Sequence, residues 1–433
     1  MLRISKKFQI EDPKTVKSQL LSWAQQFEEV VWLDTNGYEQ KYASYDAVLA
    51  VDAFTVLKTD HSNAFEKLQE YQALSNDWLF GYLSYDLKND VETLTSENYD
   101  GLQFPDLYFF QPKKLFLLKG VELQVHYLRL VEDELEGDID GILDQKVRFG
   151  YHEASLHPPK IKLRIHKDEY FAKLQRLLAH IHRGDIYEAN FCQEFYAEDS
   201  QIDPLQTYSH LNAISKPPLA TFMRLEDNYL LSASPERFLR KEGEKVISQP
   251  IKGTAKRSRD IDMDLQFREA LANDPKERSE NIMIVDLVRN DLSRTAKKGS
   301  VSVEELCEVY TFDQVHQMIS TVTSLVSEGS SPVEVIKSCF PMGSMTGAPK
   351  VSAMQIIETL EETKRGLYSG AVGYFTPEGN FDFNVVIRSI LYNHAMRYVS
   401  YSVGGAITAK SIPQKEYEEC LLKAKAMREV LER

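Results

Sequence analysis

Two pairs of glutamates, each with members three residues apart, are the clearest chemical feature of this 433-residue sequence. Glu277 and Glu280 form the first pair, and Glu416 and Glu419 form the second. Because a spacing of three places both carboxylates on one face of a helix, each pair predicts a helix that presents two negative charges together. Four converging carboxylates would bind a cation, and their all-oxygen chemistry suits Mg²⁺. The alternative is structural, with Glu277 closing a helix cap and Glu419 pairing with Lys423.

A lone lysine in "VISQPIKGTAKRSRD" indicates a different chemistry. Lys252 follows a β-branched run that ends in a proline, and Gly253 and Thr254 come directly after it. The pKa of a lysine falls when the side chain is buried beside a cation and apolar walls, and the neutral amine is then a nucleophile or a general base. The alternative is an ordinary lysine at the end of a strand, which the basic residues that follow favour.

Three further segments could bind an anion or move a proton. "GSMTGAPK" holds Ser344 and Lys350 in a turn of small residues before a helix predicted to begin near Pro349, and free N–H groups there suit a carboxylate or phosphate. Arg388 stands in "FNVVIRSILY", an apolar run predicted to be a strand, and is either paired within the protein or available to bind a carboxylate. His316 in "VHQMISTVTS" is placed in a predicted helix, where a histidine is more often structural than catalytic.

Capping signals and periodicity predict the elements that would hold these residues. Asp274 as N-cap, with Pro275 at the first helical position, predicts a helix that carries the first glutamate pair. Ser411 and Gln414 have the spacing of a capping box before the second pair. Helical and strand-like runs come in mixed rather than alternating order, which indicates an α+β fold with a largely antiparallel sheet.

Composition limits the classes of partner. The formal net charge of -14 argues against general nucleic-acid binding, because counterion release needs a basic surface. No apolar run is long enough to span a bilayer, and the start "MLRISKKFQIEDPKTV" lacks the apolar core of a signal peptide. We therefore expect a cytoplasmic protein with no nucleic-acid and no membrane partner. Reduced thiols, rather than disulfides or a zinc site, are expected because no CxxC pair occurs among Cys192, Cys307, Cys339 and Cys420.

Seven segments in order resemble the chorismate-utilising enzymes, the family of anthranilate synthase component I, aminodeoxychorismate synthase component I and isochorismate and salicylate synthases. They are "SASPERF", "PIKGT", "ENIMIVDLVRNDLSR", "GSMTGAPK", "YSGAVGYF", "VVIRS" and the second glutamate pair. The resemblance covers roughly Ile165 to the C-terminus. It implies a chorismate-binding catalytic region over residues 156–433 and a variable N-terminal subregion, residues 1–155, that contributes to the same sandwich. The implied fold is the anthranilate synthase component I-like α+β fold, with two packed, mainly antiparallel β-sheets and helices outside.

The resemblance combines the candidate residues into one site. In the family, carboxylates at the positions of the two glutamate pairs bind Mg²⁺, which holds the ring carboxylate of chorismate and helps the C4 hydroxyl to leave. Arg388 and Tyr368 match residues that hold the enolpyruvyl carboxylate. The same pocket is implied to be lined by Gly253, Thr254, Ser344, Lys350, Gly404 and Gly405.

The position of Lys252 distinguishes the members of the family. Anthranilate synthases resemble "PIAGT" there, whereas aminodeoxychorismate synthases carry "PIKGT". The resemblance implies that the lysine amine adds to ring C2 as the C4 hydroxyl leaves. Ammonia then adds at C4 and expels the lysine, giving 4-amino-4-deoxychorismate on the route to 4-aminobenzoate and folate. "SEN", from Ser279 to Asn281, also resembles this type, and Glu188 stands where isochorismate-type members carry a lysine that activates water.

The sequence departs from the family at three positions. The family histidine aligns with Gln317, one residue after His316, so a catalytic proton donor for departure of the C4 oxygen is either lost or replaced by His316 or water. Ala406 replaces a third glycine of the turn, and Lys410 replaces an aspartate.

A separate glutamine amidotransferase is implied as the source of ammonia, because no Gly-x-Cys-x-Gly turn surrounds any cysteine. Two alternative functions stay open at this point. One is anthranilate synthase component I, and the other is a weakly catalytic binding or regulatory subunit.

Overall fold

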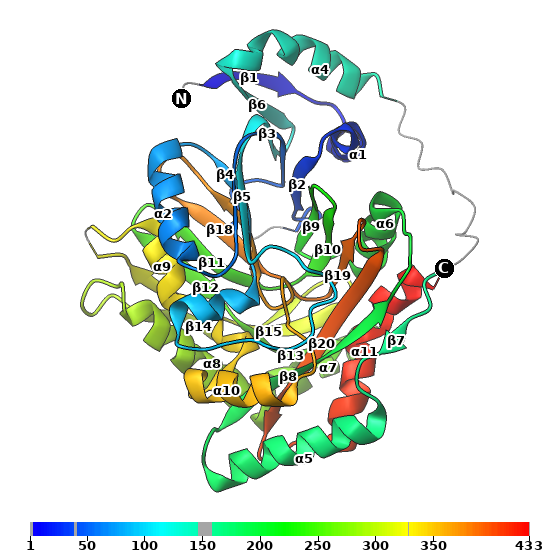
Figure 1. Cartoon of the computed structure of the whole chain (residues 1–433), viewed down its shortest axis with the longest axis vertical. Coiled ribbons are helices and arrows are strands. Elements are labelled where there is room, and N and C mark those ends of the chain that lie inside the picture. Colours follow the sequence, from blue (N-terminus) through cyan, green and yellow to red (C-terminus); the bar gives the residue numbers. More distant parts are fainter. Residues whose placement is uncertain (1–2, 39–40, 146–157, 328, 433) are drawn as a thin grey trace.

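The computed structural model describes residues 3–38, 41–145, 158–327 and 329–432. Throughout these residues, the paired strands run antiparallel and their pairings form one continuous network, with helices around the outside (Figure 1). The α+β class with mainly antiparallel, packed sheet and outer helices is thereby confirmed.

One layer of the network continues strand by strand from β3 to β8. At its end, β8 pairs with β16 near its first residue and with β7 near its last. In order of pairing, this layer contains β3 (Ala47–Thr59), β2 (Glu29–Asp34), β9 (Leu219–Leu225), β10 (Asn228–Ser234), β19 (Ser389–Asn393), β20 (Tyr398–Thr408), β8 (Glu188–Ala197), β16 (Gly347–Ala348) and β7 (Lys162–Leu163).

The other layer continues from β5 to the strands around β15. β6 (Glu122–Leu128) and β1 (Arg3–Gln9) extend it beside the second half of β5. In order of pairing, its main strands are β5 (Leu107–Lys119), β4 (Leu79–Leu83), β17 (Ala371–Phe375), β18 (Phe381–Val385), β11 (Arg237–Glu242), β12 (Lys245–Gln249) and β15 (Val315–Leu325), and β15 also pairs with β13 (Ile251–Lys256) and β14 (Ser302–Thr311).

The long strands β3 and β5 connect the two layers, because they pair with each other along most of their length and with different partners at their ends. Strands from the first third of the chain also pair directly with later ones, β2 with β9 and β4 with β17. The predicted boundary between residues 155 and 156 lies outside the described residues and stays a prediction.

The main apolar core lies between the layers and contains buried residues of both, among them Val31 and Met223 from one layer and Phe109 from the other. Side chains alternate between the two faces of a strand. On β2, Val30 and Trp32 therefore point to the opposite face, into a second core that four helices cover. The two cores enclose the strands that carry the candidate site.

Helices cover the outer faces of both layers. The first layer is covered by α1 (Pro13–Trp23), α4 (Leu135–Leu143), α6 (Pro204–Ser215) and α11 (Pro413–Leu431), while α5 (Lys167–Arg183) and α10 (Lys350–Leu360) pack beside β8. The remaining helices are α2 (Ala64–Ser75), α3 (Lys88–Val91), α7 (Ile261–Asn273), α8 (Pro275–Ser293) and α9 (Pro332–Cys339), of which α7 and α8 contact β13, β14 and β15.

The two helices that carry the glutamate pairs begin differently. α8 begins as predicted, with Pro275 as its first residue and the side chain of Asp274 accepting hydrogen bonds from the backbone N–H groups that follow. α11 has no side-chain cap. The hydroxyl of Ser411 instead accepts a hydrogen bond from the backbone N–H of Thr408 at 3.1 Å, so the predicted capping box of Ser411 and Gln414 is wrong.

Two other predicted elements are wrong. The segment around His316 is not a helix but part of β15, in keeping with the β-branched residues that follow it. The run around Arg388 is not a single strand, because β18 ends before it and β19 begins after it. Arg388 itself has a φ of 52°, a left-handed conformation that interrupts a strand.

We expect Gly373→Ala to lower the free energy of unfolding by about 1–3 kcal/mol, because overpacking a close contact forces the backbone apart. Gly373 on β17 lies opposite Gly81 on β4, and a Cβ on Gly373 would be 2.0 Å from the carbonyl oxygen of Asp382. Urea or thermal unfolding measures the change. Gly137→Ala is the control, since a Cβ on that exposed position of α4 meets nothing within 4 Å. Equal stability of wild type and Gly373→Ala would contradict this account.

Candidate active site

Lys252 lies at a β-bulge that "PIKGT" forms on β15. β12 and β13 both pair with β15, and Pro250 separates them. The register of β13 shifts by one residue within "IKGT", so that Lys252 and Gly253 stand opposite a single residue. Gly253 has a φ of 91°, which glycine adopts without strain. Bulges redirect side chains, and Lys252 here reaches Glu188 at the start of β8.

Carboxylates surround the ammonium group of Lys252. Its Nζ lies 3.2 Å from Oε1 of Glu188, and its side chain is 12% exposed. Burial lowers the pKa of Lys252, but the carboxylates of Glu188, Glu280 and Glu236 raise it by more, so the pKa lies above its usual value. The lowered pKa expected from the sequence is therefore wrong for the unliganded protein. Lys252 is an ammonium here and becomes a nucleophile only after it loses a proton.

The two glutamate pairs lie on α8 and α11, and both lie near the ammonium of Lys276 in the first turn of α8. All four carboxylates shift the pKa of this lysine. Burial lowers its pKa, and the charges of Glu280, Glu416, Glu277 and Glu419 raise it by more. The structure thus brings together two pairs that are well over a hundred residues apart in the sequence.

The glutamates fit a cation in charge and in donor chemistry. No group of three or more acidic, histidine or cysteine side chains in the described ranges is arranged so that it could hold a metal ion. Burial nevertheless raises the pKa of Glu280 to about 7, and the charge of Glu277 adds to this shift. Oε1 of Glu280 is buried and has no hydrogen-bond partner there. This oxygen lies 3.6 Å from Nζ of Lys276, an ion pair without a hydrogen bond. A buried carboxylate oxygen that accepts no hydrogen bond suits an oxygen-binding ion such as Mg²⁺, which stays a prediction.

The second glutamate pair meets the glycine turn of β20. Glu416 is buried, and burial raises its pKa. Oε1 of the half-exposed Glu419 lies 2.7 Å from Nζ of Lys423, the pairing that the structural alternative predicts. Lys423 also donates to the carbonyl oxygen of Gly404 at 2.9 Å. A Cβ on Gly405 would be 3.5 Å from Oε2 of Glu416, so a small residue leaves room beside that carboxylate.

Arg388 and Tyr368 form a cationic corner of the site. Arg388 is partly buried, and within the described part of the chain its guanidinium makes no hydrogen bond or ion pair. Burial lowers its pKa, while Tyr368 and Glu419 act in the opposite direction. The hydroxyl of the buried Tyr368 accepts a hydrogen bond from the thiol of Cys192 at 3.7 Å. A guanidinium without a partner favours the second of the two alternatives, a position that binds a carboxylate.

The "GSMTGAPK" segment connects the site to β8 and α8. The hydroxyl of Ser344 hydrogen-bonds to the carboxylate of Glu236. A Cβ on Gly347 would be only 2.2 Å from a backbone carbonyl oxygen of β8, so this close approach requires glycine. Nζ of Lys350 lies 2.6 Å from Oδ2 of Asp291, and its charge is therefore balanced within the protein.

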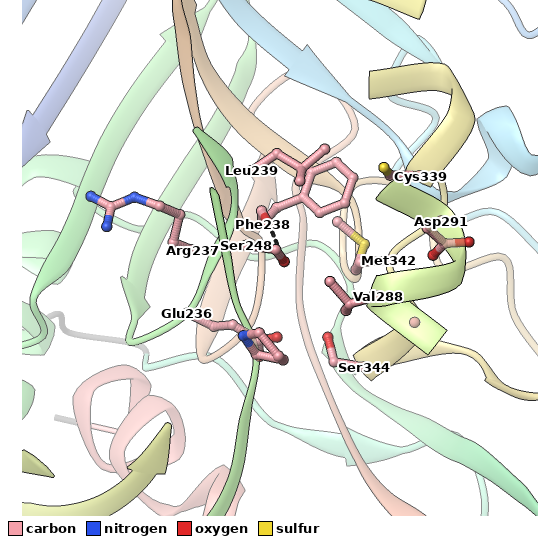
Figure 2. Close-up of a pocket in the computed structure, with 12 residues that line it drawn as sticks. Glu236, Arg237, Phe238, Leu239, Ser248, Val288, Asp291, Cys339, Met342 and Ser344 are labelled. Carbon is pink, nitrogen blue, oxygen red and sulfur yellow. Dashed lines mark hydrogen bonds between the residues drawn. The ribbon is translucent and has the colours of Figure 1, made fainter. Parts of the chain in front are cut away.

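A small pocket lies between β11, β12, α8 and the turn that contains Ser344 (Figure 2). In this view, Glu236 and Ser344 lie in the lower part of the picture, and Asp291 and Cys339 lie toward its upper right. Burial raises the pKa of Glu236 to about 7, although the Ser344 hydroxyl and the Lys252 ammonium lower it. Glu236 is thus able to exchange a proton near neutral pH beside the lysine.

His316 and Gln317 point to opposite faces of β15. Nε2 of the buried His316 lies 3.1 Å from Oδ1 of Asp264, and Nδ1 lies 3.0 Å from the hydroxyl of Thr311. Both ring nitrogens are therefore occupied within the protein. Gln317 lies opposite Thr254 on the strand that carries Lys252, and its buried Oε1 has no hydrogen-bond partner among the described residues.

A family model described as chorismate binding enzyme matches residues 28–429. The chain belongs to this family. The resemblance carried by the seven segments is confirmed, and the match begins well before Ile165, the expected start of the resemblance. The N-terminal strands that pair with β9 and β17 lie within the matched residues.

Relatives of this chorismate-binding enzyme carry two kinds of name. The anthranilate synthase component I-like protein of Synechocystis is 33% identical over 371 residues, which are 86% of this chain and 76% of the relative. Aminodeoxychorismate synthase component 1 of Salmonella typhimurium is 41% identical over 251 residues, which are 58% of this chain and 55% of the relative. The match covers 44% of the probable chloroplastic aminodeoxychorismate synthase of rice. The chain thus spans about half the length of the latter two relatives.

Solved structures share the fold. Anthranilate synthase component I of Streptococcus pneumoniae has a TM-score of 0.78 at 25% identity, with 90% of this chain and 93% of the other covered. The menaquinone-specific isochorismate synthase of Escherichia coli has a TM-score of 0.77 at 17% identity, over 99% of this chain and 94% of the other. The second likeness concerns the fold alone. None of the helices in residues 3–432 that the structure describes could cross a membrane.

Two carboxylates that surround Lys252 are absent from the predicted site residues. Glu236 lies within "SASPERF" and Glu188 within "GDIYEANFCQ", so both stand in segments that the sequence analysis considered. Their contact with Lys252 depends on strand pairings across the sheets, and Glu188 is 64 residues from it in the chain. No local sequence pattern predicts a contact between residues so far apart in the chain.

We expect Glu236→Gln to change how stability depends on pH. The folded pKa of about 7 lies above the ordinary 4.5, so the stabilising contribution of this carboxyl is complete below about pH 4.5 and is lost as the pH rises through 7. Glutamine keeps the shape and the acceptor for Ser344 but does not ionise. The melting temperature of Glu236→Gln minus that of wild type should therefore increase by a few degrees between pH 5 and pH 8. A difference that stays constant with pH would contradict the raised pKa.

Proposed function

We propose that this chain aminates chorismate at C4 with ammonia, giving 4-amino-4-deoxychorismate, as an aminodeoxychorismate synthase component I on the route to 4-aminobenzoate and folate. The observation that carries the proposal is Lys252, placed by a bulge among the carboxylates of the site. Membership of the family supports chorismate as the substrate. The name of the relative from Salmonella typhimurium supports amination at C4.

Chorismate carries two carboxylates, and the site has a cationic group for each. The unpaired guanidinium of Arg388, with the Tyr368 hydroxyl beside it, would hold the enolpyruvyl carboxylate. The ring carboxylate would lie near the glutamate pairs, where Lys276 and Lys423 also contribute positive charge. The ring between these ends would then face Lys252.

The covalent step uses Lys252 as the nucleophile. After its ammonium loses a proton, the amine adds to ring C2, the two ring double bonds shift, and the C4–O bond breaks. The electron pair leaves with the oxygen, which takes up a proton and departs as water. Ammonia then adds at C4, the double bonds shift back, and the lysine leaves C2. Glu236, with its pKa of about 7, is placed to supply or remove a proton on this side of the ring.

Mg²⁺ is part of the proposal, held by Glu277, Glu280, Glu416 and Glu419. When bound, it would supply a Lewis acid that orients the ring carboxylate and polarises the bond to the C4 oxygen. The buried oxygen of Glu280, which accepts no hydrogen bond among the described residues, is the observation in its favour.

A separate glutamine amidotransferase would supply the ammonia. All four cysteines of the chain are buried and free, so none of them offers an exposed nucleophile for glutamine hydrolysis.

Anthranilate synthase component I is the second candidate function, which the name of the Synechocystis relative favours. The two functions differ in product.

Incubation with chorismate, Mg²⁺ and ammonium should yield 4-amino-4-deoxychorismate. Lys252→Ala should lower the rate at least about a hundredfold, because it removes the nucleophile. Without ammonia, the intact mass of wild type should increase by the ring adduct, and this increase should be absent from Lys252→Ala. Liquid chromatography with mass spectrometry measures the product and the adduct.

Lys256→Ala is the matched control, since this exposed lysine lies four residues along the same strand. It should keep the wild-type rate and form the adduct. Anthranilate as the main product would refute the proposal, and so would equal rates for wild type and Lys252→Ala.

Mg²⁺ should raise the melting temperature of protein treated with a chelator, because a ligand that binds the folded state stabilises it. Glu280→Gln should lose most of this increase, whereas Glu70→Gln, an exposed position of α2, should keep it. The same titration followed by product formation should show activity that requires Mg²⁺. An equal shift in wild type and Glu280→Gln would remove Glu280 from the ligand set.

A further inference from the structure

Glu188 is the carboxylate in hydrogen-bond contact with Lys252. Its Oε1 lies 3.2 Å from Nζ, and the side chains of Glu188 and Lys252 are 2% and 12% exposed. Oε2 of Glu188 is also buried and has no hydrogen-bond partner within the described ranges. A buried acceptor without a donor is costly. An oxygen that is free beside an ammonium can instead receive its proton.

The backbone of Glu188 is fixed from two sides. Glu188 begins β8, where it lies opposite Thr408 on β20 and Ala348 on β16. The N–H of Tyr187 donates to the carbonyl oxygen of Ala348 at 2.7 Å. Gly347 approaches so closely that a Cβ there would be 2.2 Å from the carbonyl oxygen of Glu188. The turn in "TGAPK" therefore holds this carboxylate in place against Lys252.

The other carboxylates near Lys252 have different contacts. Glu236, from the turn between β10 and β11, accepts a hydrogen bond from Ser344. Glu280, from α8, lies 3.6 Å from the ammonium of Lys276. Glu277 and Glu419 also sense the charge of Lys252. Glu188 differs from these four because its side chain contacts the ammonium of Lys252 directly.

We propose that Glu188 holds the Lys252 ammonium in the resting protein and accepts its proton when the amine adds to ring C2. This proposal rests on the proposed function. In the step, an N–H bond of Lys252 breaks, the proton moves to the Glu188 carboxylate, and the released lone pair forms the bond to C2. When lysine leaves C2, the bonding pair returns to nitrogen and the Glu188 carboxyl returns the proton.

Glu188→Gln tests this role, because glutamine keeps the size and one acceptor oxygen but loses the charge and the basicity. Two measurements should change in opposite directions. Acetylation of Lys252 by acetic anhydride at pH 7.5, located by peptide mass mapping, should become about tenfold faster, as expected for a pKa that falls by about one unit. The kcat for 4-amino-4-deoxychorismate formation should fall about a hundredfold. The KM for chorismate should change less than about threefold, because substrate binding does not use this contact.

Glu194→Gln is the matched control on the same strand. Glu194 is also buried, but its carboxylate accepts a hydrogen bond from Tyr398 and pairs with Arg164 rather than Lys252. This variant should acetylate Lys252 at the wild-type rate and should keep the wild-type kcat. Glu188→Asp keeps the charge, and it should recover part of the kcat that glutamine loses.

An unchanged acetylation rate in Glu188→Gln would overturn the proposal, and so would a wild-type kcat. A fall in both would indicate a merely structural role and would also overturn it. If Glu188→Gln does not fold, Glu188→Asp should still show a lower kcat with an unchanged KM, and an unchanged kcat would then count against the role. A wild-type protein that does not aminate chorismate would refute the proposed function instead, and the acetylation rates would still decide whether Glu188 holds Lys252.

Discussion

One buried ammonium among carboxylates sets the requirements that the rest of the structure meets. Lys252 faces Glu188 from a strand, Glu236 from a turn and Glu280 from a helix. Taking charges out of water costs several kcal/mol per ion unless partners lie close and well oriented. Each carboxylate therefore has to be held by a rigid element. The pairing of β8 with β16 and β20, the capped start of α8 and the bulge of β13 provide these supports.

The charges of the site are unequal at its two ends. At one end, two glutamate pairs meet, and a buried oxygen of Glu280 accepts no hydrogen bond among the described residues. At the other end, the guanidinium of Arg388 makes no hydrogen bond or ion pair with the described residues and senses only the more distant charge of Glu419. An excess of acid at one end and an unpaired base at the other suits a ligand that is itself a dianion and is bound together with a divalent cation. This asymmetry agrees with a family whose members bind chorismate.

Local signals predict much of this site, because several of its parts are local. The cap formed by Asp274 and Pro275 fixes the start of α8 and, with it, the phase of the first glutamate pair. A spacing of three residues places Glu416 and Glu419 on one face of α11. This holds although the helix begins without the predicted capping box of Ser411 and Gln414. Ordered motifs indicated the family and the fold class, and both are confirmed.

The parts that the sequence did not predict depend on distant pairings. His316 belongs to a strand because β15 is paired on both sides, and a helical assignment from "VHQMISTVTS" could not include those partners. Arg388 leaves the strand pattern because its positive φ turns the chain between β18 and β19. The pKa of Lys252 was expected to fall because burial and a nearby cation were considered. Its rise comes from Glu188, Glu280 and Glu236, which only the folded chain brings close to it.

The raised pKa of Lys252 has a consequence for how the site is controlled. A lysine kept as an ammonium by three carboxylates is not reactive toward electrophiles that enter by chance. Each carboxylate that is neutralised, by a proton or by a cation, removes one stabilising charge and makes loss of the lysine proton easier. Glu280 belongs both to this group and to the glutamates expected to meet the ring carboxylate. Occupation of that end of the site would therefore favour the neutral amine of Lys252, so that binding and activation of the nucleophile would be linked through a single carboxylate.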